Sequence, residues 1–302
     1  MQLAGQSTAA QTFALATAVT RGLLNQAIDG IAGLGFKALS TAKATPLWQN
    51  VGLSQADEMF SFFLQREIDS GNPENTQYGG VFTLGGTNSS LYQGDMNWSE
   101  VIDESYWLIT LGGITLQNNT VSIGNTVNAA IDTGTTLIGG PSSVIADLYS
   151  QIPGSSPSTE SEGYYNYPCA TNVSASVTFG NQAYVLSPSD FLAGATDRTG
   201  ETCLGAFFSV GSDQTKTLQW IVGAAFLKSV YSVFDYNSGK PRVGFAALAD
   251  GLNGGTESST VAQTQTAKVG GGNGATSSLH RVPLQTLLAT LTATFCVFAV
   301  WL

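Results

Sequence analysis

Residues 128–141 constrain the fold of this chain more than any other stretch. Two apolar, β-prone residues, Ala130 and Ile131, lead into Asp132, and Gly134 permits a turn directly after this acid. Three hydroxyl side chains lie in or beside the turn, and they are Thr133, Thr135 and Thr136. The pattern predicts a strand that places a carboxylate in a fixed, hydrogen-bonded position among apolar neighbours. The alternative is an ordinary turn, because Asp-x-Gly alone is a common turn signal.

Few charged residues and many glycines indicate a mostly β protein. Charged residues make up 11% of the chain, compared with roughly 25% in ordinary soluble domains. The 302 residues include 35 glycines, and hydrophobic residues account for 43%, which is enough for a sizeable core. Short strands joined by Gly, Ser and Thr turns suit this composition better than charged helices do. The length allows one large domain or two modest ones.

The charge and the histidine content exclude several classes of function. The net charge is −10 and the pI is near 4.4, so nucleic acid is not an expected partner, because phosphate binding needs a basic surface. The single histidine, His280, lies beside the apolar C-terminal tail. A Ser-His or Cys-His hydrolase is therefore not expected, and neither is a histidine-based zinc site. We expect no metal and no other cofactor.

Apolar runs and alternation predict strands along the body of the chain. They fall within residues 26–36, 60–64, 79–86, 106–111, 164–180, 203–208, 220–227, 230–236 and 242–246. A short helix is expected at 45–51, with Pro46 near its start. A second helix is expected at 141–152, because apolar residues recur at helical spacing from Val144 to Ile152.

The last fifty residues differ in composition from the rest. Residues 250–279 are rich in Gly, Ser, Thr, Gln and Asn and predict a flexible linker. The apolar run 287–302 is shorter than the roughly 20 residues of a membrane-spanning helix. Small residues at 274–278, a short spacer and this apolar end match a signal for a glycosylphosphatidylinositol (GPI) anchor. The alternatives for residues 280–302 are a plain tail anchor, or neither a GPI signal nor a tail anchor.

Other features favour an extracellular or cell-surface protein. Asn-x-Ser/Thr sequons, which accept N-linked glycans, occur at Asn88, Asn97, Asn118 and Asn172. In that setting Cys169 and Cys203 are expected to form a disulfide, with buried thiols as the alternative. No signal peptide is visible at the start of the chain.

The motif around Asp132 resembles the second active-site motif of the pepsin-like aspartic peptidases, and the resemblance covers roughly residues 1–247. It is closest to the secreted fungal members. The segments that carry it are Ile28–Gly35, Val81–Gly94, Tyr106–Thr110, Ile131–Thr136, Ile221–Gly223, Val233–Asp235 and Val243–Ala246. Cys169 and Cys203 fall where the family carries its second-lobe disulfide.

The resemblance implies a pepsin-like, mostly β fold and a division of the chain. Residues 1–98 would be the remnant of the first lobe with the inter-lobe segment, and 99–249 the second lobe. It also implies an aspartic endopeptidase that acts on proteins or peptides at acid pH, prefers bulky hydrophobic residues, and is expected to be monomeric.

The same resemblance assigns roles to individual residues. Asp132 would be one of two catalytic carboxylates, and Thr133 would brace the floor of the site. Gly134 would allow close backbone approach, while Thr135 and Thr136 would hydrogen-bond Asp132 or the substrate. Two further residues, Ile31 and Ile221, would be apolar pocket walls or structural core.

Two departures from the family pattern stand out. Ala224 follows Ile221–Gly223 where the family usually has Asp. No second Asp-Thr-Gly occurs, and Asp29-Gly30 cannot replace it because the intervening Thr is missing. The first motif is therefore expected to precede residue 1, in a longer protein of which this chain is the C-terminal part. The competing hypotheses are a catalytically inactive surface binding protein and a pair of chains that each contribute Asp132.

Overall fold

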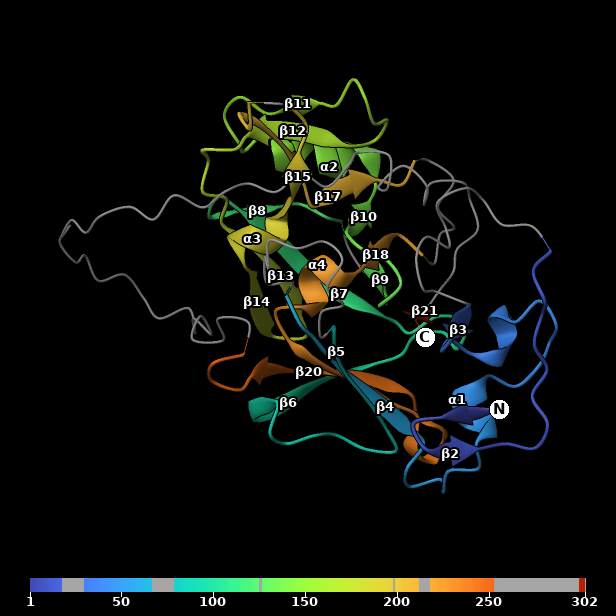
Figure 1. Cartoon of the computed structure of the whole chain (residues 1–302). Helices are drawn as coiled ribbons and strands as arrows, with labels where there is room; N and C mark the ends of the chain where they lie inside the picture. Colours follow the sequence, from blue (N-terminus) through green and yellow to red (C-terminus); the bar gives the residue numbers. More distant parts are fainter. Residues whose placement is uncertain are drawn as a thin grey trace.

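The computed structural model covers the whole chain and describes residues 1–17, 30–66, 79–124, 127–197, 199–211, 218–252 and 299–301. Within these ranges the protein is mostly β, as predicted (Figure 1). The helices are short, and they are η1 Lys37–Leu39, α1 Leu47–Asn50, α2 Ser142–Tyr149, α3 Pro188–Phe191, α4 Ala224–Leu227 and η2 Asn237–Gly239.

The strands are numbered in chain order. Those of the first half are β1 Gln2–Leu3, β2 Gln6–Ser7, β3 Ile31–Gly33, β4 Met59–Leu64, β5 Gly80–Leu84, β6 Tyr92–Glu100, β7 Leu108–Leu116, β8 Asn119–Val121, β9 Val127–Ile131 and β10 Ile138–Gly140. Those of the second half are β11 Ser156–Pro157, β12 Tyr165–Pro168, β13 Ala175–Phe179, β14 Gln182–Leu186, β15 Leu192–Ala195, β16 Thr202–Gly205, β17 Phe207–Ser209, β18 Trp220–Val222, β19 Tyr231–Asp235, β20 Arg242–Leu248 and β21 Ala299–Trp301.

The largest sheet of the described residues carries the Asp132 segment at its centre. Its strand order is β14-β13-β7-β9-β18-β10-β17, with β8 paired to β7. β18 pairs in parallel with β9 and antiparallel with β10, so it lies between the strand before the Asp132 turn and the strand after it. Every residue of β9, β10 and β18 is buried. A single strand, about ninety positions later in the sequence, therefore pairs with both the strand before the turn and the strand after it.

A second sheet joins distant parts of the chain. Its order is β5-β4-β19-β20-β6, so residues 231–248 pair with residues 59–100 (Figure 1). Aromatic side chains fill the core beneath it: Phe60 and Phe234 stack with ring centroids 5.0 Å apart, and Trp107 packs against both. Aromatic side chains bury large apolar areas, so this packing is a main source of stability. The smaller third sheet has the order β11-β12-β16-β15.

Most local expectations agree with the structure, with three differences. The strand expected over 220–227 ends at Val222, and Ala224–Leu227 form helix α4 instead. The helix expected at 141–152 is α2, which buries Ile145, Leu148 and Tyr149. The strand expected from Tyr106 begins only at Leu108, because Trp107 turns into the core and donates from Nε1 to the carbonyl of Leu34 at 3.0 Å. The strand expected over 26–36 is described only as β3, whose residues are exposed or half-buried, and residues 26–29 lie outside the described ranges.

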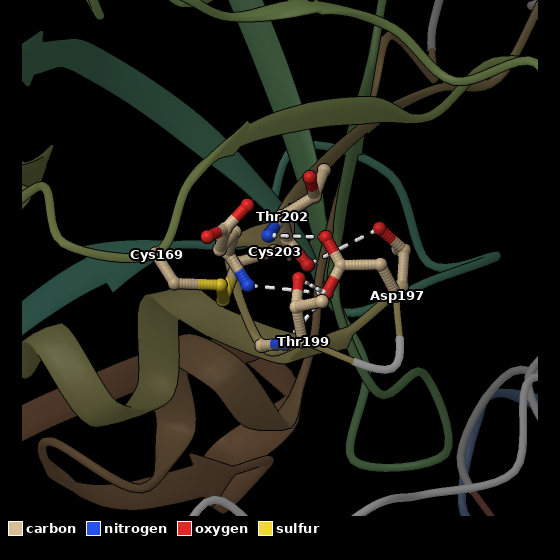
Figure 2. Close-up of a disulfide and its surroundings, with 8 residues drawn as sticks. Cys169, Asp197, Thr199, Thr202 and Cys203 are labelled. Atoms are coloured by element: carbon tan, nitrogen blue, oxygen red, sulfur yellow. Dashed lines mark hydrogen bonds between the residues drawn. A yellow bond between two sulfur atoms is a disulfide. The ribbon is translucent and has the colours of Figure 1, made fainter.

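The predicted Cys169–Cys203 disulfide is present, with the two Cα atoms 5.0 Å apart (Figure 2). Beside it, Asp197 organises the loop that leads into β16. Its Oδ1 accepts from the backbone amides of Gly200 at 2.6 Å and Glu201 at 3.0 Å, and its Oδ2 accepts from the amide of Thr202 at 2.8 Å. A carboxylate that accepts several hydrogen bonds is favoured in its ionised form.

The Asp197 carboxylate is predicted to stabilise its loop until the pH falls to about 2. Hydrogen bonding by Thr202, assisted by Thr199, lowers the pKa of Asp197 from 3.8 to about 2. A pKa that is lower in the folded than in the unfolded chain stabilises the fold at pH values above the unfolded-state pKa. This stabilisation is lost as the pH falls through about 2. We therefore expect Asp197→Asn to unfold at lower urea concentration than wild type at about pH 5, with the difference vanishing near pH 2. Equal midpoints at both pH values would contradict this account of the loop.

Within the described ranges, none of the helices has the length and apolar content that a membrane-spanning helix needs. The same ranges hold no group of three or more His, Cys, Asp or Glu side chains placed to bind a metal ion. The predicted linker lies outside the described residues from residue 253 on, and so does the predicted anchor signal apart from residues 299–301.

Candidate active site

Asp132 directly follows β9 and is held in place by its backbone. Its amide donates to the carbonyl of Val222 on β18 at 3.0 Å. The residue is only 4% exposed. A charged residue with this little exposure needs hydrogen-bonding partners, because burying a carboxylate without them is costly.

The Asp132 turn supplies those partners. The amide of Gly134 donates to Oδ1 at 2.9 Å, and the hydroxyl of Thr135 donates to Oδ2 at 2.6 Å. Both carboxylate oxygens therefore accept a hydrogen bond from within three residues, as the sequence predicted for this carboxylate. Thr136 is exposed.

The start of α4 supports the turn from behind. The amide of Gly223 donates to the carbonyl of Leu137 at 3.1 Å, and the amide of Ala224 donates to the carbonyl of Thr135 at 2.7 Å. A Cβ atom at position 223 would overlap the carbonyl oxygens of both Thr135 and Leu137. The close approach therefore requires glycine at this position. Ala224 makes its support through the backbone, so the departure from the family's usual Asp leaves this contact intact.

The side-chain hydroxyl of Thr133 is not satisfied by the described residues. Its Oγ1 is buried and has no hydrogen-bond partner among the described residues. A buried hydroxyl without a partner costs free energy, so such an atom calls for an explanation.

A small apolar cluster lies next to the site. Ile221, 8% exposed, packs with Leu108, Ala130 and Leu218, and Tyr106 covers them. Successive strand residues point to opposite faces of a sheet. The neighbours of Ile221 and Ala130 along their strands belong to the main core, so this cluster occupies the other face of β7, β9 and β18. Ile31, by contrast, is 39% exposed on β3 and is not core.

The match to known proteins agrees with this geometry. The family model described as eukaryotic aspartyl protease matches residues 1–248. The chain belongs to this family. The resemblance seen in the motifs is thereby confirmed over nearly the whole body of the chain.

Three relatives of this chain illustrate the match. The chain is 39% identical over 265 residues to the major aspartyl peptidase 1 of Cryptococcus neoformans. The matched region covers 83% of this chain and 54% of that relative. The chain is 33% identical to an aspartic protease of Phaffia rhodozyma, over 80% of this chain and 57% of the relative. It is 34% identical to pepsin A of Sus scrofa, over 82% of this chain and 62% of the relative. The chain thus spans between half and two thirds of the length of these relatives.

The chain also contains an Asp-Ser-Gly tripeptide at residues 69–71, outside the described ranges. Glu67-Ile68 precedes it where the Asp132 motif has two apolar residues, and Asn72-Pro73 follows it where that motif has hydroxyl side chains. Its flanks therefore differ from the Asp132 motif on both sides, and we assign it no role.

The hydrogen bond from Thr135 gives a test of the site. We expect Thr135→Ala to lower kcat/KM for peptide cleavage by about 10- to 100-fold, since a hydrogen bond to a charged group contributes roughly 1.5–3 kcal/mol. Thr135→Ser keeps the hydroxyl and should retain most of the activity. The measurement is steady-state cleavage by the full-length natural protein at acid pH. An Ala variant as active as the Ser variant would show that this bond does not position Asp132.

Proposed function

We propose that this chain forms part of an aspartic-type endopeptidase in which Asp132 is one of two catalytic carboxylates. The observation that carries the proposal is the held carboxylate itself: both oxygens of Asp132 accept hydrogen bonds from the turn, and the turn is supported by β18 and α4. Membership of the eukaryotic aspartyl protease family supports the same chemistry.

The reaction needs two carboxylates that share one proton, because two adjacent acids do not both ionise at acid pH. The ionised member takes a proton from a water molecule between them, and this water attacks the scissile carbonyl carbon. The protonated member donates a hydrogen bond to the carbonyl oxygen. General base and general acid thus come from the same residue type, as in aspartic proteases generally.

We propose that the second carboxylate comes from an Asp-Thr/Ser-Gly motif N-terminal to residue 1. Thr133 supports this arrangement, because its buried Oγ1 has no partner among the described residues and is suited to a hydrogen bond from a facing active-site loop. The relatives are longer than this chain, which leaves room for such a segment.

The proposed substrates are proteins or peptides, cleaved between bulky hydrophobic residues. The apolar cluster of Leu108, Ala130, Leu218 and Ile221 supports this preference, because Ala130 lies two positions before Asp132 and the cluster occupies the sheet face away from the main core. Apolar pockets bind apolar side chains by removing their surface from water.

The proposed location is extracellular or at the cell surface. The Cys169–Cys203 disulfide supports it, since disulfides persist mainly in oxidising compartments. The low pKa of the Asp197 carboxyl supports acid conditions, because this loop keeps its charge down to about pH 2.

The coding sequence upstream of Met1 tests the proposal. We expect it to continue the reading frame and to encode a secretion signal, followed by a second Asp-Thr/Ser-Gly with two apolar residues before it. An intact upstream sequence that lacks this motif would overturn the two-carboxylate proposal. A natural 302-residue form that binds protein ligands but cleaves none would instead favour the surface binding protein.

A further inference from the structure

The four sequons of the chain lie in different structural environments. Three of their asparagines have side-chain nitrogens that no described residue engages, and the fourth, Asn97, uses its nitrogen to join β6 to the β13–β14 hairpin. We propose that the folded protein carries N-linked glycans at Asn88, Asn118 and Asn172, and that Asn97 stays unmodified. The inference is independent of the proposed peptidase activity.

The modification replaces one hydrogen of the asparagine side-chain amide. The donor is an oligosaccharide linked to a lipid pyrophosphate. The Nδ2 atom bonds to the anomeric carbon of the sugar, the bond from that carbon to the pyrophosphate oxygen breaks, and the amide loses one proton. The lipid pyrophosphate is the leaving group. A modified asparagine therefore keeps only one Nδ2 hydrogen and carries a bulky polar group on that nitrogen.

Asn97 needs both of those hydrogens. It lies on β6, half-buried, and its Nδ2 donates to the carbonyl of Phe179 at 3.0 Å and to the hydroxyl of Tyr184 at 3.1 Å. These bonds join β6 to the β13–β14 hairpin. The hydroxyl of Tyr184 in turn donates to the carbonyl of Phe245 at 3.4 Å. A glycan on Asn97 would remove at least one bond and would have to occupy the space between these elements, so modification here is incompatible with the native contacts.

Asn118 has the opposite setting. Gln117 and Asn118 form the two-residue turn between β7 and β8, with φ values of 50° and 63°, and Leu116 pairs with Asn119 across it. Positive φ at both central residues is the pattern of a type I′ hairpin turn, which asparagine tolerates well. The side chain of Asn118 is exposed, and it has no hydrogen-bond partner in the part of the chain that the structure describes.

Asn172 lies beside the same turn. The amide of Gln117 donates to the carbonyl of Ser174 at 2.8 Å, and its side-chain oxygen accepts from the amide of Ser174 at 3.3 Å. Its side-chain nitrogen donates to the backbone carbonyl of Asn172 at 3.4 Å. Gln117 thus holds both sequons in place through backbone groups, and the exposed amide of Asn172 stays available. Two glycans at this position would cover β8, a three-residue edge strand whose open side is a point of unwanted pairing.

At Asn88 the sequon fixes its own amide. The side-chain Oδ1 accepts from the amide of Ser90 at 3.1 Å and from its hydroxyl at 2.7 Å. The hydroxyl that defines the sequon is therefore bonded to the asparagine it serves. The backbone amide of Asn88 donates to the hydroxyl of Tyr231 at 2.9 Å, which anchors the β5–β6 turn to the core. These contacts use Oδ1 and the backbone and leave Nδ2 for the sugar.

Site-resolved mass spectrometry tests this assignment. The full-length natural protein, produced in a glycosylating yeast, is purified as folded protein and deglycosylated by an amidase in ¹⁸O water, which converts each modified asparagine to labelled aspartate. We expect label at Asn88, Asn118 and Asn172 and none at Asn97. Label at Asn97 in the folded fraction, or a missing label at any of the other three, would overturn the assignment.

Sequon variants give a matched control. Ser99→Ala removes the Asn97 sequon without touching its amide and should leave the glycoprotein mass unchanged. Thr120→Ala and Ser174→Ala should each remove one glycan. Asn97→Ala should lower the melting temperature of the deglycosylated protein, whereas Asn172→Ala, at an exposed position without positive φ, should not. A loss of glycan mass in Ser99→Ala, or equal melting temperatures for the two Asn variants, would contradict the structural role of Asn97.

Discussion

Replacing Asp132 by Asn is expected to reduce peptide cleavage by the full-length natural protein by about 10²- to 10⁴-fold in kcat, the contribution typical of a general acid or base. The amide has nearly the same shape as the carboxylate, and its oxygen can still accept one of the two hydrogen bonds that Gly134 and Thr135 now donate. It cannot ionise, so it can neither activate a water molecule nor share a proton with a second acid. The change therefore removes chemistry and leaves the fold.

Asp147→Asn is the matched control for this variant. Asp147 is exposed on α2, and the same acid-to-amide change there removes one charge away from the site. It should retain wild-type kcat and KM. Assays at several acid pH values, with melting temperatures recorded for each protein, separate lost chemistry from lost folding. Comparable activity in Asp132→Asn and Asp147→Asn would contradict a catalytic role for Asp132.

Gly223→Ala is expected to destabilise the protein by about 3 kcal/mol or more, because an added Cβ in a packed site forces the surrounding structure to move. The atoms in its way are the backbone carbonyl oxygens of Thr135 and Leu137, which cannot turn aside as a flexible side chain could. Either β18 or the Asp132 turn must shift. The variant should therefore lose activity as well as melting temperature, by roughly 10 °C for a chain of this size.

Gly86→Ala serves as the control for the glycine variant. A Cβ at Gly86 would meet nothing within 4 Å. Its melting temperature and activity should match those of wild type within experimental error. If Gly223→Ala unfolded at the same temperature as Gly86→Ala and kept its activity, the close approach at position 223 would not be what fixes the Asp132 turn.

Local patterns predicted the parts of the fold that depend on neighbouring residues. The apolar approach to Asp132 and the glycine after it predicted a strand followed by a turn, which the structure shows as β9 and its hydrogen-bonded loop. Helical spacing predicted α2, which begins after Pro141 and buries its apolar stripe. The disulfide could also be predicted, because only two cysteines lie in the body of a chain with extracellular features.

Long-range contacts could not be read from the sequence by such rules. No local pattern near β9 indicates that Trp220–Val222 pairs with it in parallel, since the two segments are about ninety residues apart. Only the family resemblance pointed to Ile221–Gly223 as the strand that complements the Asp132 motif. Local patterns also do not predict the two hydrogen bonds from Asn97, which looks like any other sequon in the sequence. The Asp197 loop likewise became visible only when its backbone amides were placed around one carboxylate.

Ile31 and Ile221 show that burial, too, could not be predicted from the local sequence. Both stand in similar apolar runs, and the sequence left pocket wall and core open for each. The structure separates them: Ile221 joins a buried cluster on the face of the sheet opposite the main core, while Ile31 is exposed on a short strand. Burial depends on which elements pack against a residue, and that information is spread over the whole chain.

Binding of a transition-state mimic tests the central claim most directly. A peptide inhibitor that carries a tetrahedral hydroxyl in place of the scissile carbonyl, titrated calorimetrically into the full-length natural protein at acid pH, should bind tightly because such mimics bind roughly 10²- to 10⁸-fold more strongly than substrates. We predict that Asp132→Asn weakens this binding by at least about 100-fold, while Asp147→Asn leaves it unchanged. Equal affinity in wild type and Asp132→Asn would contradict the claim that Asp132 is a catalytic carboxylate.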